Sequence, residues 1–162
     1  METATTDYKP VGGVARAVLY RPEACNAAFV DGVCTASFDG GGVEVALIDE
    51  CSSFEEVAAC DSGRISVVHT LSLVASRNDA DLWLAPQFVA DAVRRGVVAD
   101  LTLNDGRRLI AGFSADFADE QPLRLLSLRS ASGERLAQTP TVTLTLRSED
   151  TAGASPLNTT AL

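Results

Sequence analysis

Basic side chains other than arginine are almost absent from this sequence. Lysine occurs once, at Lys9, and histidine once, at His69, against twelve arginines. Acidic residues outnumber basic ones, so the formal net charge is −9 at pH 7. Sequence-independent attraction to nucleic acid needs clustered Lys and Arg, which displace counterions from the phosphates. We therefore expect no such attraction, and we expect no sequence-specific binding of nucleic acid either.

Long hydrophobic runs are also lacking. No stretch reaches the roughly 18 apolar residues that a membrane-spanning helix requires. The first ten residues, METATTDYKP, are polar and acidic, whereas a secretory signal begins basic and continues apolar. These features predict a cytoplasmic protein with no membrane partner.

Side chains that carry enzyme chemistry do not cluster in the sequence. His69 could be a general base or a metal ligand, but either role needs further groups beside it. The simpler interpretation is a core imidazole that is hydrogen-bonded to a neighbouring hydroxyl or carbonyl. Gly40 to Gly42 lie between two short strands rather than before a helix, and Ser114 lacks the Gly-x-Ser-x-Gly context of a nucleophile elbow. We therefore predict a protein that is not an enzyme, with no catalytic, cofactor-binding or metal-binding residues and no cofactor.

The four cysteines are spaced too widely for a structural zinc site. Cys25, Cys34, Cys51 and Cys60 form a C-x8-C-x16-C-x8-C pattern, whereas paired zinc ligands lie about two to four residues apart. A disulfide framework is an alternative, but the polar N-terminus favours reduced thiols. We expect free cysteines, buried or at the surface, to which the sequence assigns no role.

Alternating apolar and polar residues predict a chain built mostly of strands. In the clearest strand, residues 64–76, one face carries Ile65, Val67, His69, Leu71 and Leu73. Further strands are expected at residues 14–21, with Val14, Val18 and Tyr20 on one side, and at residues 33–38, 43–48, 123–131 and 140–148.

Turn residues indicate how some of these strands connect. Residues 97–117 read as a hairpin around Asn104-Asp105-Gly106, because a tight primed turn needs the positive φ that Gly106 supplies and Asp tolerates. The glycines at 40–42 are expected to join strands 33–38 and 43–48 as another hairpin. Residues 49–64 show no clean period. They predict a long excursion, with at most a helical turn near residues 54–59.

One helix is expected, at about residues 79–95. Asn78 is a suitable cap, Pro86 marks the start of the regular part, and Gly96 ends the helix. Trp83 and Phe88 would anchor the helix on the sheet.

Together these elements predict a mainly β fold, an antiparallel β-barrel or sandwich with that single flanking α-helix. Residues 1–12 are expected to form a flexible N-terminal arm, residues 13–148 a single β domain, and residues 149–162 a flexible, polar C-terminal tail.

The order of elements resembles that of the tail tube proteins of long-tailed bacteriophages and their relatives in contractile injection systems. A long loop is followed by the strand ISVVHTLSLVA, the helix APQFVADAVRR and the late strands in GVVADLTLNDGRRLIAGFSADF and PLRLLSLRSASGERLAQTPTVTLTLRSED. The resemblance covers residues 64–150 and concerns element order, not a diagnostic motif. Proteins of that family build hexameric rings that stack into a tube.

The resemblance implies a non-enzymatic structural subunit of a phage or prophage-derived tail, either tube-like or a completion-ring component. Its partners would be copies of itself and other tail proteins, joined through β-edges and loops. It would be cytoplasmic before assembly and in the virion or injection apparatus afterwards. Residues 49–64 would be an assembly loop, and the acidic balance would suit a lumen along which DNA slides.

Two readings from other classes remain open. The first is a monomeric β-sandwich module that binds a ligand such as a peptide or sugar. The second is an enzyme whose site is assembled from scattered Asp, Glu and Arg residues and His69.

Overall fold

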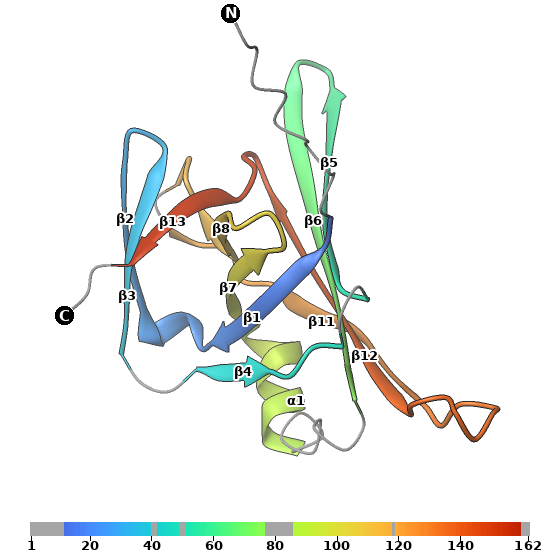
Figure 1. Cartoon of the computed structure of the whole chain (residues 1–162). Coiled ribbons are helices and arrows are strands. Elements are labelled where there is room, and N and C mark those ends of the chain that lie inside the picture. The colour runs from blue at the N-terminus through green and yellow to red at the C-terminus, as the bar shows by residue number, and fades with distance from the viewer. Residues whose placement is uncertain (1–11, 40–41, 49–50, 77–85, 118, 160–162) are drawn as a thin grey trace, which may run out of the picture.

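The structure, a computed structural model, describes residues 12–39, 42–48, 51–76, 86–117 and 119–159. Strands dominate these residues, which contain one α-helix and a single short 3-10 turn, η1 (Pro22–Ala24). The strands form a seven-stranded, a four-stranded and a two-stranded sheet (Figure 1). The two large sheets pack as a sandwich and do not close into a barrel. The expectation of a mainly β fold with one helix is confirmed, in its sandwich form.

The seven-stranded sheet has the strand order β2-β3-β13-β8-β7-β1-β4. Every neighbouring pair in it is antiparallel except β13 and β3, which run parallel. Its strands are β1 (Val14–Tyr20), β2 (Cys25–Val30), β3 (Val33–Phe38), β4 (Val43–Val45), β7 (Val98–Leu103), β8 (Arg108–Ala111) and β13 (Ser155–Thr159).

The four-stranded sheet is antiparallel throughout and has the order β11-β12-β6-β5. It consists of β5 (Ser53–Asp61), β6 (Arg64–Ser76), β11 (Arg124–Ala131) and β12 (Thr141–Asp150). In Figure 1 the β5–β6 hairpin projects from one end of the molecule and the β11–β12 hairpin from the other. A short pair, β9 (Phe113–Ser114) and β10 (Asp119–Glu120), forms the third sheet.

The main hydrophobic core lies between the two large sheets. Side chains from β1, β4 and β7 meet side chains from β6 and β12, and Ala92 of the helix α1 (Pro86–Arg94) closes the cluster. The predicted alternation on residues 64–76 and 140–148 is confirmed: Leu71, Leu73, Leu144 and Leu146 are fully buried. A smaller cluster on the other face of the seven-stranded sheet joins Cys25, Cys34, Ala36, Val98, Ile110 and Leu157.

The faces of β1 differ from the predicted ones because the strand contains a bulge. The pairing with β7 shifts between Val14 and Arg16, so Ala15 is an extra residue. Val14, Ala17 and Leu19 therefore all face the main core, whereas Tyr20 stacks on Phe38 with ring centroids 3.9 Å apart. The predicted grouping of Val14 with Tyr20 is wrong, because an extra residue reverses the alternation.

The helix begins at Pro86, as predicted for its regular part, and Phe88 packs on the main core. Its end is confirmed as well: Gly96 adopts φ 78°, and its amide donates to the carbonyl of Asp91 at 3.0 Å. Asn78 and Trp83, the expected cap and anchor, lie outside the described residues. No helix in the described part of the chain has the length and apolar character to cross a membrane.

The hairpin around Gly106 is confirmed, but its turn is of another kind. Gly106 has φ 89°, whereas Asp105 does not adopt a positive φ. The amide of Gly106 donates to Leu103 at 3.0 Å, which is the pattern of a three-residue loop ending in a left-handed glycine. The two-residue primed turns lie elsewhere, at Asp31-Gly32 and Ser62-Gly63, where both residues have positive φ.

Two predicted connections are wrong. Residues 33–38 and 43–48 do not form a hairpin, because β3 pairs with β2 and β13 while β4 pairs with β1, near the opposite edge of the sheet. Residues 49–64 are not a long loop, because β5 occupies Ser53–Asp61 and pairs with β6 along its whole length.

Residues 149–159 of the expected C-terminal tail 149–162 are not the flexible segment that their polar composition predicts, and residues 160–162 lie outside the described residues. β12 continues to Asp150, and β13 then inserts between β3 and β8. Leu157 is 4% exposed and belongs to the second hydrophobic cluster. A single buried leucine and two strand partners thus hold a segment whose composition is otherwise polar. The predicted N-terminal arm, residues 1–12, lies almost wholly outside the described residues.

Candidate functional site

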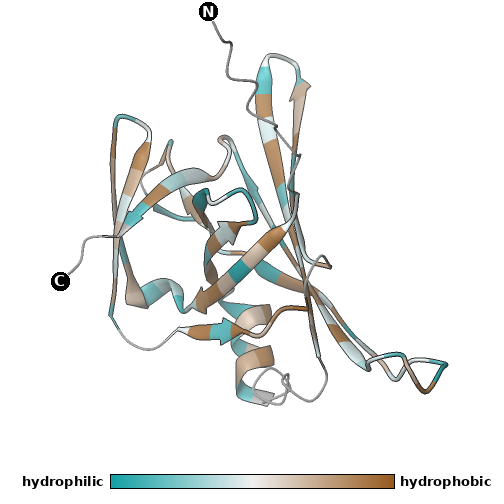
Figure 2. Ribbon diagram, viewed as in Figure 1, coloured by the Kyte–Doolittle hydropathy of each residue, from teal (hydrophilic) through white to brown (hydrophobic). Residues whose placement is uncertain are grey.

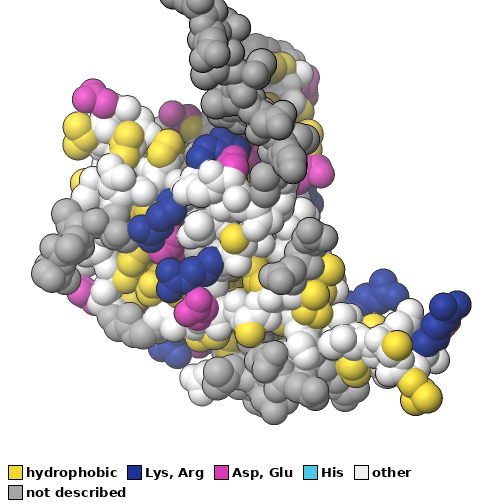
Figure 3. Space-filling model, viewed as in Figure 1, with side chains coloured by type: hydrophobic (Ala, Val, Ile, Leu, Met, Phe, Trp, Pro, Cys, Tyr) yellow, Lys and Arg dark blue, Asp and Glu magenta, His cyan; other side chains and the backbone are white. Residues whose placement is uncertain are grey.

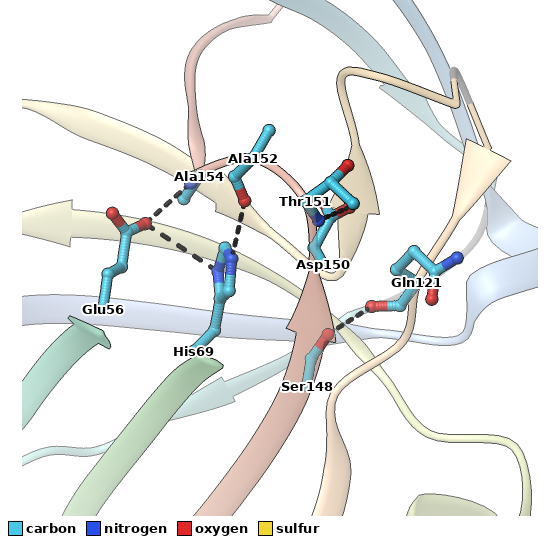
Figure 4. A network of polar contacts seen from close by, with 8 residues as sticks. All are labelled: Glu56, His69, Gln121, Ser148, Asp150, Thr151, Ala152 and Ala154. Atoms are coloured by element: carbon cyan, nitrogen blue, oxygen red, sulfur yellow. Dashed lines mark hydrogen bonds and ion pairs between the residues drawn. The ribbon is translucent and has the colours of Figure 1, made fainter. Parts of the chain in front are cut away.

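His69 lies in the core, as the simpler interpretation predicts. Its ring is 4% exposed, and its Nε2 is 2.9 Å from the carbonyl oxygen of Ala152, to which it donates (Figure 4). Nδ1 faces Glu56 Oε1 at 3.8 Å, which is too long for a hydrogen bond. The imidazole therefore fastens the chain between β12 and β13 to the four-stranded sheet.

Glu56 holds the same crossing segment from β5. Its Oε1 accepts a hydrogen bond from the amide of Ala154 at 2.6 Å (Figure 4). Gly153 lies against this carboxylate: a Cβ on Gly153 would come within 3.0 Å of Glu56 Oε2. Both polar side chains on this part of the β5–β6 hairpin thus serve to position the strand that follows.

A second polar group closes the turn after β12. Asp150 Oδ1 accepts hydrogen bonds from Ser114 Oγ at 2.8 Å and from the amide of Thr151 at 2.7 Å. The hydroxyl of Ser148 donates to the carbonyl of Gln121 at 3.0 Å (Figure 4). The hydroxyl of Ser114 therefore donates to a buried carboxylate and helps to close this turn.

Asp100, on β7 of the seven-stranded sheet, is a further buried acidic residue. It is 6% exposed, and its Oδ2 accepts a hydrogen bond from Arg108 at 2.7 Å, while its Oδ1 has no hydrogen-bond partner among the described residues. Burial raises the pKa of Tyr20 above its ordinary value, and the negative charge of Asp100 adds to this effect. Asp100 and Arg108 thus form an ion pair across two neighbouring strands of the seven-stranded sheet.

All four cysteines are free thiols, two buried and two exposed. Burial raises the pKa of Cys25 to about 12, and the nearby Cys34 adds to the shift. Burial likewise raises the pKa of Cys34 to about 11. Both thiols thus stay protonated at neutral pH, and a protonated thiol is neither a nucleophile nor a metal ligand.

Metal ligands do not converge in the part of the chain that the structure describes. No group of three or more His, Cys, Asp and Glu side chains there could hold an ion. A cavity of about 460 Å³ lies between β1 and α1, lined by Leu19, Tyr20, Arg21, Phe88 and Asp91 among others. Arg21 and Asp91 face each other across it at 3.4 Å.

The free edges of the four-stranded sheet are the candidate functional surface. β5 is an edge strand nine residues long, exposed from Glu55 to its end, and it includes the uncharged stretch 57–60. Val57 is 51% exposed and Ile65, on the facing strand, 54%. Figure 2 shows hydrophobic residues continuing along this hairpin beyond the body of the fold.

The opposite edge is β11. Val97 pairs with Leu123, just before the strand, and beyond that bridge no described strand lies along the outer side of β11. Leu126 is 62% exposed at a bulge in this strand, and Leu136, in the loop that follows, is fully exposed. Two unpaired edges thus bound the sheet.

Sequence reasoning missed β5 because neither of its faces is buried. With exposed residues on both sides, no hydrophobic period marks the strand. A signal was nevertheless present: Ser62-Gly63 stands directly between the two strands, and such a dipeptide is typical of a two-residue hairpin turn.

Comparison with known proteins gives no match. No protein-family model, no curated protein and no solved structure matches the chain. The geometry defines a class, a mainly β sandwich with one flanking helix, in which β5 and β11 are the edges of the four-stranded sheet.

Proposed function

We propose that this protein is a non-enzymatic structural subunit that assembles with copies of itself through the edges of its four-stranded sheet. The observation that carries the proposal is that β5 and β11, the two edge strands of that sheet, have no described strand on their outer sides. Exposed backbone donors and acceptors on an edge are a template for another strand.

The direction of the strands suits a ring. Because four antiparallel strands alternate in direction, β5 and β11 run opposite ways. A second copy placed in the same orientation can therefore set its β11 beside β5 and continue the antiparallel ladder. Contacts of this head-to-tail kind close into rings or continue as filaments.

The β5 edge has only some of the devices that keep edge strands apart, namely the charges of Glu55, Glu56 and Asp61. It contains no lysine and no proline, and its pairing with β6 runs without a bulge. The stretch 57–60 offers Val, Ala, Ala and Cys to a partner strand. In a monomer such an edge favours aggregation, whereas in an assembly it is covered.

The setting that we propose for this assembly is a phage or prophage-derived tail, as a tube-like or completion-ring component. The support is the order of elements from residue 64 onward, a long strand, one helix and further antiparallel strands. The long loop that the resemblance expects before them is instead the strand β5. Its partners would be further copies and other tail proteins, and it would pass from the cytoplasm into the virion or injection apparatus.

An acidic lumen is not supported by the sheet face that such a ring would present. The face of the four-stranded sheet that points away from the core carries mainly Ser and Thr, with several Val and Ala residues and a few charges. Three acids, Glu55, Asp61 and Glu149, stand against four arginines, Arg64, Arg124, Arg129 and Arg147. The acidic surplus of the chain therefore lies elsewhere. Figure 3 likewise shows acidic and basic side chains next to one another over the face in view, not gathered by sign.

A proline on β5 tests the proposal. The strands flank a two-residue turn, so Asp61 and Arg64 exchange backbone hydrogen bonds and the bonded pairs recur at every second residue. The amide of Ala58 then points away from β6, and Ala58→Pro blocks the free edge while sparing the hairpin. Ala27→Pro is the matched control, because Ala27 takes the same position on β2, the edge of the other sheet.

Light scattering and negative-stain microscopy at rising concentration should show rings or tubes for the wild type and for Ala27→Pro. Ala58→Pro should stay monomeric with its unfolding transition retained. If Ala58→Pro disturbs folding, Val57→Lys places a charge on the same edge instead. A wild type that remains monomeric at the highest attainable concentration contradicts the proposal.

A second candidate, a monomeric ligand-binding module, is favoured by the cavity between β1 and α1. Its volume of about 460 Å³ falls in the range of small-molecule sites, and its apolar walls carry the Arg21–Asp91 pair. A ligand there should raise the unfolding temperature, and Leu19→Trp, which fills the cavity, should abolish that shift.

A further inference from the structure

The two free edges of the four-stranded sheet differ in charge. On the face that points away from the core, β5 carries Glu55 and Asp61, and β11 carries Arg124 and Arg129. All four side chains are exposed. No ion pair involves any of them among the described residues.

Arg124 is in an unfavourable place within its own chain. It lies directly opposite Arg147 on β12, and like charges at facing positions of a sheet repel. Arg147 has Glu149 as a partner at 2.9 Å, but Arg124 has none. Its other neighbouring position lies beyond the edge of the sheet, where an acid from another chain would relieve the repulsion.

We propose that the joint between copies is polar: the acidic edge β5 of one copy pairs with the basic edge β11 of the next, and Glu55 and Asp61 meet Arg124 and Arg129. The inference rests on the proposed function. It adds the partner of each edge and excludes a two-fold joint, because pairing β5 with β5 or β11 with β11 would place like charges together.

The pairing registers of the sheet allow this match. Glu55 stands in one row with Thr70, Arg147 and Arg124, and Arg129 lies in the row of Thr143, four residues further along β12. A stagger of four residues between copies therefore sets Glu55 opposite Arg129.

The alternative stagger of six sets Asp61, six residues beyond Glu55 on β5, opposite Arg124. In either stagger the other acid and the other arginine lie two rows apart, as diagonal neighbours within reach of long side chains. Both staggers are even, so they keep the two faces of the sheet aligned, and both lay β5 along the whole of β11. Closed barrels of eight strands have a shear of about eight residues, which is about four residues for every four strands. The stagger of four residues between copies therefore matches the shear that closes a barrel.

Charge reversal tests the polarity. The variant with Glu55→Arg and Asp61→Arg has two basic edges, and the variant with Arg124→Glu and Arg129→Glu has two acidic edges. For each variant alone, the concentration at half-assembly should rise about tenfold or more, since every joint then brings like charges together. A chain that carries all four changes should assemble again, and so should an equal mixture of the two variants.

The matched control is Asp119→Arg with Glu120→Arg, the same double reversal on the exposed strand β10. It should assemble like the wild type, and circular dichroism should show all variants folded. The rescue should weaken at about 1 M salt, where the screening length falls to about 3 Å.

The outcomes separate the two proposals. Assembly of the wild type that is blocked by Ala58→Pro but unaffected by the charge reversals would overturn the polar joint and leave the proposed function standing. Loss of assembly from the β5 reversal, without rescue by the β11 reversal, would show that the charges of β11 are not the partners of those on β5 and would overturn the inference. A wild type that never assembles would overturn both.

Discussion

At the residue scale, the polar side chains of this protein hold the fold at one place, the crossing from β12 to β13. His69, Glu56 and Asp150 come from three strands of one sheet, and all three bind backbone or hydroxyl groups at that crossing. These hydrogen bonds fix the position of the crossing segment, while Nδ1 of His69 has no hydrogen-bond partner among the described residues. The single histidine is thus explained by its structural partner.

Ser114→Ala should test how much this crossing depends on Asp150. The change removes the hydroxyl that donates to Asp150 at 2.8 Å and leaves a buried carboxylate with fewer donors. We expect a loss of about 2 kcal/mol in the free energy of unfolding, measured by urea denaturation. Ser127→Ala, on the exposed strand β11, should change that free energy by less than about 0.5 kcal/mol. Equal losses in both variants would show that the network carries no special stability.

The buried thiols predict a loss of stability in alkali. The pKa values of Cys25 and Cys34, about 12 and about 11, lie above the 9.0 of an unfolded thiol, so the folded state favours the protonated form. Their contribution is complete below about pH 9 and falls as the pH rises from there toward the folded values, because only the unfolded chain then loses protons.

The measurement is the free energy of unfolding at about pH 8 and about pH 10 in a reducing buffer. Replacing both buried thiols, with Cys25→Ala and Cys34→Ala, should flatten the decline between these two values, whereas Cys60→Ser, at an exposed thiol, should leave it as in the wild type. The comparison of slopes matters here, because the core variant also loses packing and starts from a lower stability. An unchanged slope in the core variant would contradict the assigned shifts.

At the element scale, β13 is the strand that ties the last part of the chain to the seven-stranded sheet. It pairs with β3 on one side and β8 on the other, and Leu157 inserts into the cluster around Cys34 and Ile110. Without it the strands β2 and β3 would lose their connection to the rest of the sheet. This polar segment is therefore held in the sheet by its two strand partners and by one buried leucine, although its composition is typical of a flexible tail.

Leu157→Ala should therefore destabilise the protein by about 3 kcal/mol, the usual cost of a cavity at a fully buried leucine. Asn158→Ala, at the exposed neighbouring position, is the control and should be nearly neutral. Urea denaturation followed by circular dichroism gives both values. A neutral Leu157→Ala would restore the interpretation of residues 149–162 as a tail.

Elements with one buried face could be predicted from the sequence, and those without one could not. β6 and β12 alternate strictly because their inner residues fill the core, and the helix from Pro86 carries its own start and stop signals. β5 has no buried face, and β13 has a single strongly buried leucine, so periodicity could reveal neither. Long-range pairing decided both strands, and no local pattern encodes that pairing.

For the candidate surface, too, the sequence predicted what burial determines and missed what strand pairing determines. The sequence predicted correctly that His69 is a hydrogen-bonded side chain in the core, because residues on the apolar face of a strand are usually buried. It could not place the free edges, since an edge is defined by which strand has no neighbour. The close packing of Gly42 on Tyr20, where a Cβ would come within 2.5 Å of the ring, is likewise a tertiary contact.

At the scale of the whole molecule, the two large sheets have different roles. The seven-stranded sheet has hydrophobic clusters on both faces, whereas the four-stranded sheet has one buried face and one that carries Ser, Thr and a few charges. Both of its hairpins project beyond the body of the fold (Figure 1). Such a sheet is supported by the rest of the protein and offers its edges and outer face to other molecules.

Hydrogen exchange should report on this division directly. In the monomer, the outward amides of β5, such as that of Ala58, have no partner strand and should exchange rapidly, while β12, between β6 and β11, should be protected. Assembly through the edges should slow exchange in β5 and β11 at least about tenfold and leave β2, an edge of the other sheet, as fast as before. Ala58→Pro provides the monomeric state for this comparison, and the assembled wild type provides the assembled state. Protection that appears on β2 instead would move the joint to the seven-stranded sheet, because an amide exchanges slowly only where a new strand covers it.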